Sequence, residues 1–381
     1  MRKPVRRSSL GAEGLMIFRQ REATAGRAAA GVPTAWLPGW VAYLAGVLGQ
    51  AAGKYDSQTE RLFEHAWRRQ RSLRAMVGWL RFRRELGLAP EARQVKSLQT
   101  ALDGKQGRLT TQTLELLLEA EALAPAVTGL SDKMLMAQAN SSPPVAHLAL
   151  ARGLNLSARA TRLAALQAGQ ISSRNDFAAQ LGAVMGRVCV VGNAGSLNGA
   201  GVGAAIDDHD LVVRFNQWTT PHSVRADIGG RCDVWVCAPR FLAGRQWREP
   251  ATARWIVLTG PDVRYARAGT PVDWDRVLEL QGGGARILTV PLDIWGESVA
   301  WVGAPPSAGI LFLFWAKRMM GGLQHLAVAG FDIASANANG YHHAGQHLRP
   351  GRRHNWDRER LLLDAWIAAG LGCVTGGTVS H

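Results

Sequence analysis

The chain is poor in cysteine, and the few it has are not grouped. Only 4 of the 381 residues are cysteine, and they lie at Cys189, Cys232, Cys237 and Cys373. A disulfide framework or a zinc site requires more cysteines, or pairs at short and regular spacing. We therefore expect ordinary reduced thiols in a reducing compartment.

The common short signatures of nucleotide and nucleic-acid binding are also missing. There is no G-x-G-x-x-G in dinucleotide register and no G-x-x-x-x-G-K-[ST], which argues against a dinucleotide fingerprint and a P-loop. There is no C-x-x-C…H-x-x-x-H and no aromatic stretch of the kind found in RNA-recognition motifs. Binding of nucleic acid therefore has no motif to support it, although charge alone leaves it open.

Acidic residues are in short supply relative to basic ones. The chain has 29 Asp and Glu against 44 Lys and Arg, a formal net charge of +15. Such an excess favours anionic partners, namely nucleotides, phosphate-bearing glycolipids, nucleic acid or an acidic membrane surface. Charge does not choose among these partners.

The N-terminal part has no long uninterrupted apolar run. Residues 1–34 are rich in Arg, Ala, Gly and Ser, a composition that predicts a disordered basic tail. Residues 35–53 are about as long as a membrane span, but Pro38, four glycines and Gln50 dilute their hydrophobicity. The segment is compatible with a membrane span or with a buried or interfacial helix, and the dilution favours the helix.

Two patterns divide the rest of the chain. Apolar residues recur at three- and four-residue spacing from about residue 57 to 170, which predicts amphipathic helices with basic outer faces. We assign residues 35–174 to an α-helical accessory region and residues 175–381 to the catalytic domain. The helix over 109–123, with a threonine start and a leucine-rich face, belongs to the first pattern.

Short apolar runs in the second half predict the strands of a sheet. They cover residues 188–191, 211–215, 233–238, 255–259, 286–290 and 325–330. Their alternation with helical or irregular segments is typical of parallel sheets covered on both faces. The predicted fold class is α/β, a Rossmann-like and mostly parallel sheet flanked by helices, with an N-terminal α-helical region.

The first of these strands ends in a glycine-rich loop. Gly192, Asn193 and Ala194 follow the apolar run 188–191, and Asn216 follows the next run. A loop with few side chains lets backbone N–H groups approach an anion or a nucleotide. The ends of strands in α/β sheets are where ligands usually bind.

Three later segments carry further candidates. Ser307, followed by Ala308 and Gly309, precedes an apolar helix, so it is expected to cap a helix N-terminus that attracts phosphate. Tyr341 and His342 stand in a polar loop. His354 precedes a helix whose first turns contain Glu359, and its imidazole is a candidate general base.

These segments resemble, in order, the motifs of the eukaryotic-type sialyltransferases, glycosyltransferase family 29. V-V-G-N-A-G-S-L at 190–197 is similar to the family's large sialylmotif. P-S-A-G-I-L at 306–311 resembles the small sialylmotif P-S-[ST]-G-x-L, with Ala308 in place of the hydroxyl residue. The third motif is matched by Tyr341 and His342, and the very small motif H-x-x-x-x-E by His354 and Glu359. Further matches are Ile206, Asp207, His209, Asp210, Val213, Arg214, Asn216, Arg225, Asp227, Ile228, Gly229 and Arg231.

The resemblance implies an inverting, metal-independent glycosyltransferase with a GT-A-like variant of the Rossmann-like fold. It would move sialic acid or a related keto-sugar such as Kdo from a CMP-sugar to a hydroxyl of a glycan or glycolipid. By the same resemblance His354, Glu359, Tyr341 and His342 are catalytic. The donor-binding residues would be Gly192, Asn193, Ala194, Asn216, Ser307, Ala308 and Gly309.

No metal or other cofactor is expected from the resemblance. Asp273-Trp274-Asp275 has the D-x-D form of metal-dependent glycosyltransferases, but it lies outside the matched motifs and predicts a surface turn. The two family cysteines that form a disulfide in secretory-pathway members are replaced by Val188 and Met320. We therefore expect a bacterial-type cytoplasmic enzyme, with peripheral contact to an anionic inner membrane. The alternative is a non-catalytic nucleotide-binding or membrane-associated interaction protein that keeps the fold.

Overall fold

The computed structural model describes residues 36–88, 90–102, 116, 131–184, 186–218, 224–238, 252–261, 272–331, 352–375 and 378–380. The predicted tail 1–34, nearly all of the helix expected at 109–123, and Tyr341 and His342 lie outside these residues.

The chain folds as two compact units that are interleaved along the sequence. The helical unit combines residues 1–116 with 293–306 and 352–355, and the sheet unit combines residues 117–292, 307–351 and 356–381. The segment around His354 is thus grouped with the N-terminal helices. The domain boundaries drawn from composition stay a prediction, because they follow chain order and these units do not.

The sheet unit is built on one eight-stranded sheet in the order β5-β4-β3-β2-β1-β6-β7-β8. Neighbouring strands are parallel except β7 and β8, which pair antiparallel. The strands are β1 (Val188–Val191), β2 (Leu211–Phe215), β3 (Val234–Cys237), β4 (Trp255–Pro261), β5 (Arg286–Val290), β6 (Leu326–Ala329), β7 (Gly372–Thr375) and β8 (Thr378–Ser380). The six predicted strands are confirmed, and β7 and β8 were missed.

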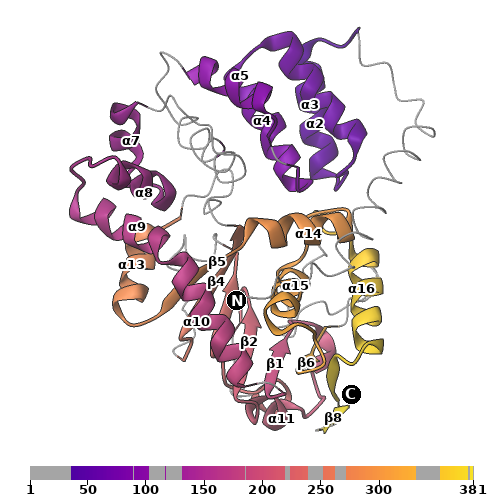
Figure 1. Cartoon of the computed structure of the whole chain (residues 1–381). Helices are drawn as coiled ribbons and strands as arrows, with labels where there is room; N and C mark the ends of the chain where they lie inside the picture. Colours follow the sequence, from indigo (N-terminus) through magenta and orange to yellow (C-terminus); the bar gives the residue numbers. More distant parts are fainter. Residues whose placement is uncertain are drawn as a thin grey trace, which may run out of the picture. The chain divides into compact units, whose positions relative to one another are not determined.

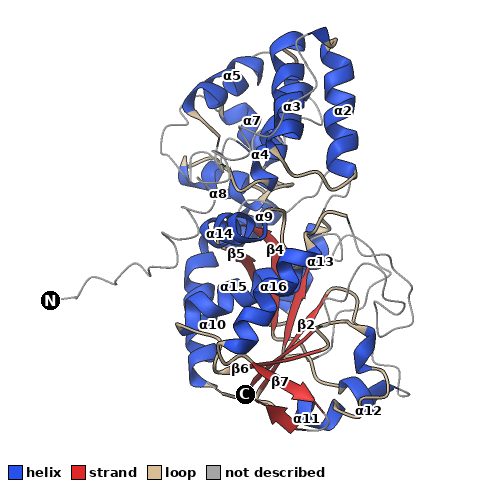
Figure 2. Ribbon diagram, turned by 90° about the vertical axis from the view of Figure 1, so that its right-hand side faces the viewer, coloured by secondary structure: helices blue, strands red, loops and turns tan. Residues whose placement is uncertain are grey.

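Helices cover both faces of this sheet, as Figure 2 shows. The described helices of the sheet unit are α7 (Asp132–Gln138), α8 (Pro143–Ala151), α9 (Ala158–Ala168), α10 (Gln170–Ala183), α11 (Gly203–Asp207), α12 (Arg225–Ile228), α13 (Trp274–Gly282), α15 (Ala308–Met320) and α16 (Trp356–Ala368). Phe177 of α10 contacts the rings of Phe312 and Trp315 of α15 and of Trp255 of β4. These two helices therefore cover one face.

The opposite face is covered by shorter helices. Ile206 of α11 and Ile228 of α12 pack with Cys189, Val191 and Val212 of the central strands. Each strand thus turns alternate side chains toward opposite helix layers, as a buried parallel sheet requires. The predicted class, a mostly parallel Rossmann-like sheet flanked by helices with further helices at the N-terminus, is confirmed.

The described residues of the helical unit include the helices α2 to α5, which are labelled in Figure 1. They are α2 (Gly39–Ala51), α3 (Ser57–Gln70), α4 (Leu73–Glu85) and α5 (Ala92–Leu102), and the unit also takes in most of α14 (Leu292–Val302). Asp56 caps α3 by accepting from the Thr59 N–H at 2.7 Å, and Ser72 caps α4 by accepting from the Ala75 N–H at 3.3 Å. No helix among the described residues is both long and apolar enough to cross a membrane.

Candidate functional site

The polar candidates of the sheet unit lie at the edge where its parallel strands end. β1 lies between β2 and β6 in the sheet. After β1 the chain continues through α11 to β2, which pairs with one side of β1. The strand order reverses between β1 and β6, and at such a switch point the loops after the two strands diverge and leave a crevice. Asn193, Asn216 and Phe331 follow the ends of β1, β2 and β6. We call this region the carboxyl edge.

Gly192 lets the loop after β1 lie directly against the loop after β6. A Cβ at position 192 would lie 2.2 Å from the carbonyl oxygen of Gly330, so only glycine fits. The N–H groups of Gly192 and Ala194 donate to the carbonyl oxygens of Ala329 at 2.8 Å and Gly330 at 3.2 Å. These two N–H groups are therefore not available to a ligand, contrary to the expectation from the sequence, because both already donate to the neighbouring loop.

Asn193 offers a ligand an acceptor instead. Its Nδ2 donates to the carbonyl oxygen of Phe215 at 3.0 Å, which fixes the orientation of the amide because a carbonyl only accepts. Its Oδ1 is buried and has no hydrogen-bond partner among the described residues. A buried acceptor without a partner is costly unless a ligand or water satisfies it.

Asn216 shapes the turn after β2. It has a φ of 50°, in the left-handed region that disfavours residues other than glycine and Asn. Its Oδ1 accepts from the Ala238 N–H at 3.1 Å, and its backbone oxygen accepts from Trp235 Nε1 at 2.8 Å. Since Oδ1 is engaged, Nδ2 is the group of this amide that is able to donate to a ligand.

This geometry predicts different costs for two substitutions of Asn216. Asn216→Gly loses the bond to Ala238 but relieves the strain, so we expect a destabilisation of about 1 kcal/mol. Asn216→Ala loses the bond and keeps the strain, so we expect about 2 kcal/mol. Urea unfolding of the two variants and the wild type measures the difference, and an alanine variant as stable as the glycine variant would contradict the strain.

The N-terminus of α15 lies at the same edge. Ser307 caps it, as predicted, by accepting from the Ile310 N–H at 3.4 Å. Gly309 packs against the ring of Phe331, because a Cβ there would lie 2.8 Å from a ring carbon. The Phe331 ring in turn contacts that of Phe215 at 6.0 Å. Ala308, partly buried, starts the helix and offers only its backbone.

Glu359 of α16 is entirely buried beside this helix start. Its side chain is 0% exposed, and its Oε1 accepts from the Ser307 N–H at 2.7 Å. Burial raises the pKa of Glu359 to about 7, while hydrogen bonds from the Ser307 hydroxyl and N–H lower it. The carboxyl group therefore binds Ser307 and not solvent, which makes it a positioning group for the α15 cap.

His354 belongs to the helical unit. Its Nδ1 bonds the carbonyl oxygen of Pro305 at 2.9 Å, and the next residue, Asn355, donates from Nδ2 to the carbonyl oxygen of Val302 at 3.1 Å. A carbonyl accepts only, so the proton of the neutral ring is on Nδ1 and its lone pair is on Nε2. In this tautomer Nε2 is the nitrogen that is able to act as a general base.

A partly buried ion pair anchors the residue before His354. Arg353 donates from Nε to Glu85 Oε2 at 3.1 Å and also from Nη2 to the same oxygen. Its guanidinium lies over the Trp295 ring, 5.9 Å from the centroid, and Trp295 Nε1 donates to the carbonyl oxygen of Arg84 at 3.1 Å. Burial lowers the pKa of Arg353. Sequence reasoning missed this pair, which links residues 268 positions apart.

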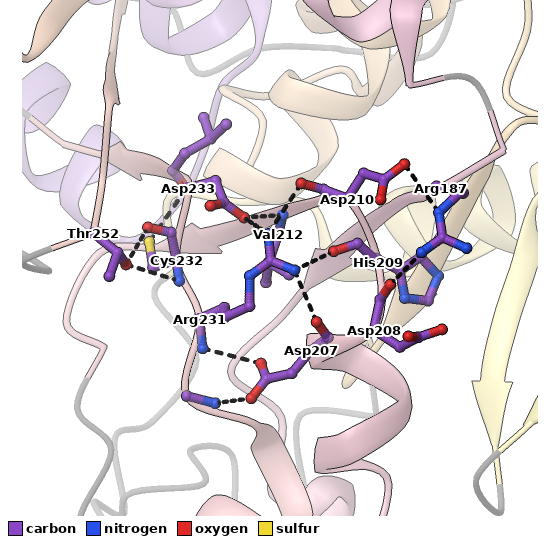
Figure 3. A network of polar contacts seen from close by, with 12 residues as sticks. Arg187, Asp207, Asp208, His209, Asp210, Val212, Arg231, Cys232, Asp233 and Thr252 are labelled. Carbon is purple, nitrogen blue, oxygen red and sulfur yellow. Dashed lines mark hydrogen bonds and ion pairs between the residues drawn. The ribbon is translucent and has the colours of Figure 1, made fainter.

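Several motif residues prove to hold the sheet unit together at the opposite edge, where the strands begin (Figure 3). The Arg231 guanidinium donates to the backbone oxygens of Asp207 at 2.8 Å and Asp210 at 3.0 Å, and to Asp233 Oδ2 at 3.0 Å. The Asp207 carboxylate accepts from the N–H groups of Gly230 at 2.6 Å and Arg231 at 3.0 Å. This part of the motif is therefore structural.

Arg214 completes this framework from inside the sheet. It is 1% exposed and donates to the backbone oxygens of Arg231 and Ile228. Burial lowers its pKa to about 10, which still leaves it charged at neutral pH. The neighbouring Cys189 and Cys232 are free thiols whose pKa burial raises to about 12, so both are unreactive.

The D-x-D sequence has a structural explanation. Asp273 caps α13 by accepting from the Arg276 N–H at 3.1 Å. Asp275 forms an ion pair with Arg159, with 3.3 Å between Oδ1 and Nε. Trp274 is buried in the core. In the described part of the chain no three His, Cys, Asp or Glu side chains gather as a metal site.

Comparisons with known proteins point to one family. The model of glycosyltransferase family 29 (sialyltransferase) matches residues 148–264, which include the large motif but not Ser307, His354 or Glu359. No curated protein sequence matches the chain at a significant level.

Two solved structures are similar to the chain. One is described as a mammalian sialyltransferase in complex with Gal-beta-1-3GalNAc-ortho-nitrophenol; it is 21% identical with a TM-score of 0.34, and the match covers 48% of this chain and 66% of that one. The other, a mammalian sialyltransferase, is 21% identical with a TM-score of 0.35, over 52% of this chain and 76% of that one. The chain thus spans just under two thirds of the first. Residues 148–264 thus match the model of glycosyltransferase family 29 (sialyltransferase), the family whose motifs the sequence resembles.

Proposed function

We propose that the chain is an inverting, metal-independent glycosyltransferase that moves sialic acid, or a related keto-sugar such as Kdo, from a CMP-sugar to a hydroxyl of a glycan or glycolipid. The observation that carries the proposal is the bond from His354 Nδ1 to the Pro305 oxygen, because it leaves the lone pair on Nε2. The family match over residues 148–264 supports the transfer class.

In this reaction His354 is the general base. Nε2 takes the proton of the acceptor hydroxyl while its oxygen attacks the anomeric carbon on the face opposite the nucleotide. The bond from the anomeric carbon to the phosphate oxygen breaks, and CMP leaves with the electron pair. The bond from Nδ1 to Pro305 orients the ring and stabilises the imidazolium that forms.

The carboxyl edge supplies complementary groups for the donor. Oδ1 of Asn193, which has no hydrogen-bond partner among the described residues, is an acceptor. It therefore suits a ribose hydroxyl better than a phosphate, which has no proton to donate at neutral pH. Nδ2 of Asn216 donates and suits a phosphate oxygen. The start of α15, at Ser307, Ala308 and Gly309, adds N–H groups and a positive dipole end for the nucleotide.

A nucleoside monophosphate carries less charge than a diphosphate, so hydrogen-bond donors of the protein are able to stabilise this leaving group without a metal ion. We assign Tyr341 and His342 to this role by their place in the third motif. Glu359 acts through Ser307, whose N–H it binds. The proposed setting is the cytoplasmic side of a membrane that carries a glycolipid or a lipopolysaccharide precursor.

The test incubates purified protein with CMP-sialic acid or CMP-Kdo in EDTA and measures CMP release by chromatography, with and without crude lipopolysaccharide as acceptor. We expect acceptor-dependent release with one donor, unchanged by EDTA. Donor binding without any release would favour the non-catalytic alternative, and release that requires a divalent cation would overturn metal independence.

The ion pair between Glu85 and Arg353, the residue before His354, is expected to position the imidazole of His354. Glu85→Gln removes the charge that holds Arg353, so we expect the imidazole to lose its orientation and kcat to fall about tenfold with little change in the KM for the donor. Glu85→Asp should restore part of the loss. Steady-state kinetics with a circular dichroism control measure both variants, and an equal loss in kcat and in folded fraction would reduce the role of the pair to stability.

A further inference from the structure

The outer face of α2 is apolar and exposed to solvent. Trp36, just before the helix, is 70% exposed, and Trp40, Leu44 and Leu48 are 62%, 51% and 68% exposed. Trp40, Leu44 and Leu48 lie at four-residue spacing on α2 and form one stripe along the helix, and Trp36 continues the same spacing into the residues before it. We call this stripe the tryptophan face. Residues 39–51 contain no charged side chain that would interrupt it.

The inner face of the same helix consists of small residues, mainly glycine, and we call it the glycine face. A Cβ on Gly39 would lie 2.8 Å from Arg69 Cβ, on Gly46 it would lie 3.1 Å from the Phe63 ring, and on Gly49 it would lie 3.2 Å from Thr59 Oγ1. The backbone of α2 thus packs closely on α3. A surface helix ordinarily turns its largest apolar residues inward. Here they point outward, which indicates that the tryptophan face is covered by a partner.

Basic side chains lie next to α2 within the helical unit. Arg69, which touches Gly39 of α2, is exposed, and so are Arg68, Arg71 and Arg74. The Arg74 guanidinium lies 5.6 Å from the Tyr43 ring of α2. Residues 1–34, which lead into the helix, contain seven Lys or Arg and two Glu, a net of +5.

We propose that the tryptophan face inserts into the interface of an anionic lipid bilayer, with α2 lying parallel to the membrane surface. Tryptophan prefers the boundary between headgroups and acyl chains because its ring is apolar and its N–H is polar. The exposed basic side chains next to α2 attract anionic headgroups. Because the glycine face is packed on α3, only one side of the helix is available, which sets the parallel orientation.

A second copy of the chain fits this surface less well. Two copies joined through their tryptophan faces about a two-fold axis bring like-charged arginine clusters together, which opposes association. An anionic bilayer offers apolar depth and opposite charge at once. The proposal concerns attachment and does not depend on the transfer reaction.

The test is sedimentation of the full chain with vesicles of phosphatidylcholine alone or with 30 mol% phosphatidylglycerol, a fraction chosen at roughly the charge density of an acidic membrane surface. The Trp36→Ser/Trp40→Ser variant should bind the anionic vesicles at least about tenfold more weakly than wild type. Arg69→Gln/Arg74→Gln should also weaken binding by about tenfold, and raised salt should weaken the wild type. All four substituted residues are exposed, and circular dichroism is used to check that each variant is folded.

The matched control removes two exposed apolar side chains elsewhere. Leu150 and Ile171 are 45% and 72% exposed on α8 and α10, and Leu150→Ser/Ile171→Ser should bind vesicles like the wild type. Wild type that does not bind anionic vesicles, or a tryptophan variant that binds as tightly as wild type, overturns the proposal. So does a wild-type dimer in light scattering that becomes monomeric in the tryptophan variant while vesicle binding stays the same.

Discussion

Replacement of His354 by asparagine is expected to abolish transfer while leaving the fold intact. Asparagine Nδ2 occupies nearly the position of imidazole Nδ1, so the variant keeps a donor for the Pro305 oxygen that His354 binds at 2.9 Å. It has no counterpart of the Nε2 lone pair. Loss of a positioned general base typically costs 10² to 10⁴ in rate, and we expect kcat to fall by roughly 10³.

Two further variants separate a base from a structural histidine. His354→Ala loses both the base and the bond to Pro305, so it should be as inactive as His354→Asn but less stable by about 1 kcal/mol. His147, exposed on α8, provides a control whose replacement by alanine leaves turnover unchanged.

The readouts are CMP release, titration calorimetry with the donor, and the pH dependence of kcat/KM. Wild type should gain activity as the base loses its proton, and the His354→Asn profile should lack that limb. Donor affinity should remain within a few-fold of wild type. Transfer by His354→Asn at more than a tenth of the wild-type rate would refute the assignment of the base.

Local pattern predicted six strands of the sheet because each of them is a short and mostly apolar run. Val188–Val191 and Leu211–Phe215 are buried at every position, so the sequence contains the whole signal. β7 has four residues, two of them not buried, and β8 has three residues, two of them polar by sequence, which is too little for a pattern. Asn193 and Ser307 were found because strand ends and helix caps are local features.

What local pattern did not predict are contacts between segments far apart in the chain. The pairing of Glu85 with Arg353, and the grouping of residues 352–355 with the N-terminal helices, leave no periodicity in either segment. The residues that match the family motifs also differ in their structural roles. Asp207 and Arg231 hold the strand starts together, whereas Asn193 presents an acceptor at the opposite edge. Resemblance alone does not separate these roles, but the geometry does.

Glu359→Gln is expected to stabilise the protein at alkaline pH. Burial raises the pKa of Glu359 from 4.5 to about 7, so the folded state holds a proton that the unfolded state releases between these values. Stability therefore falls as pH rises from about 4.5 to about 7 and is constant above that range. The charged form costs on the order of 3 kcal/mol at pH 8. Glutamine retains an acceptor for the Ser307 N–H and carries no charge.

The variant and the wild type should thus have equal stability near pH 4.5, and the variant should lead by a margin that grows to about 3 kcal/mol at pH 8. Urea unfolding at several pH values, followed by far-UV circular dichroism, measures that margin. Glu279, an exposed carboxylate on α13, supplies the control, since Glu279→Gln should show no such growth.

Glu359→Ala tests the other half of the argument. It removes the acceptor of the Ser307 N–H, a bond of 2.7 Å, and leaves a cavity in a site that is 0% exposed. We expect a loss of about 2 kcal/mol or more relative to glutamine at every pH, together with weaker donor binding because the α15 cap loosens. A glutamine variant whose stability tracks the wild type from pH 4.5 to 8 would mean that the carboxylate is ionised in the fold at little cost. In that case Glu359 would bind Ser307 as a charged cap, and the inference that burial raises its pKa would be wrong.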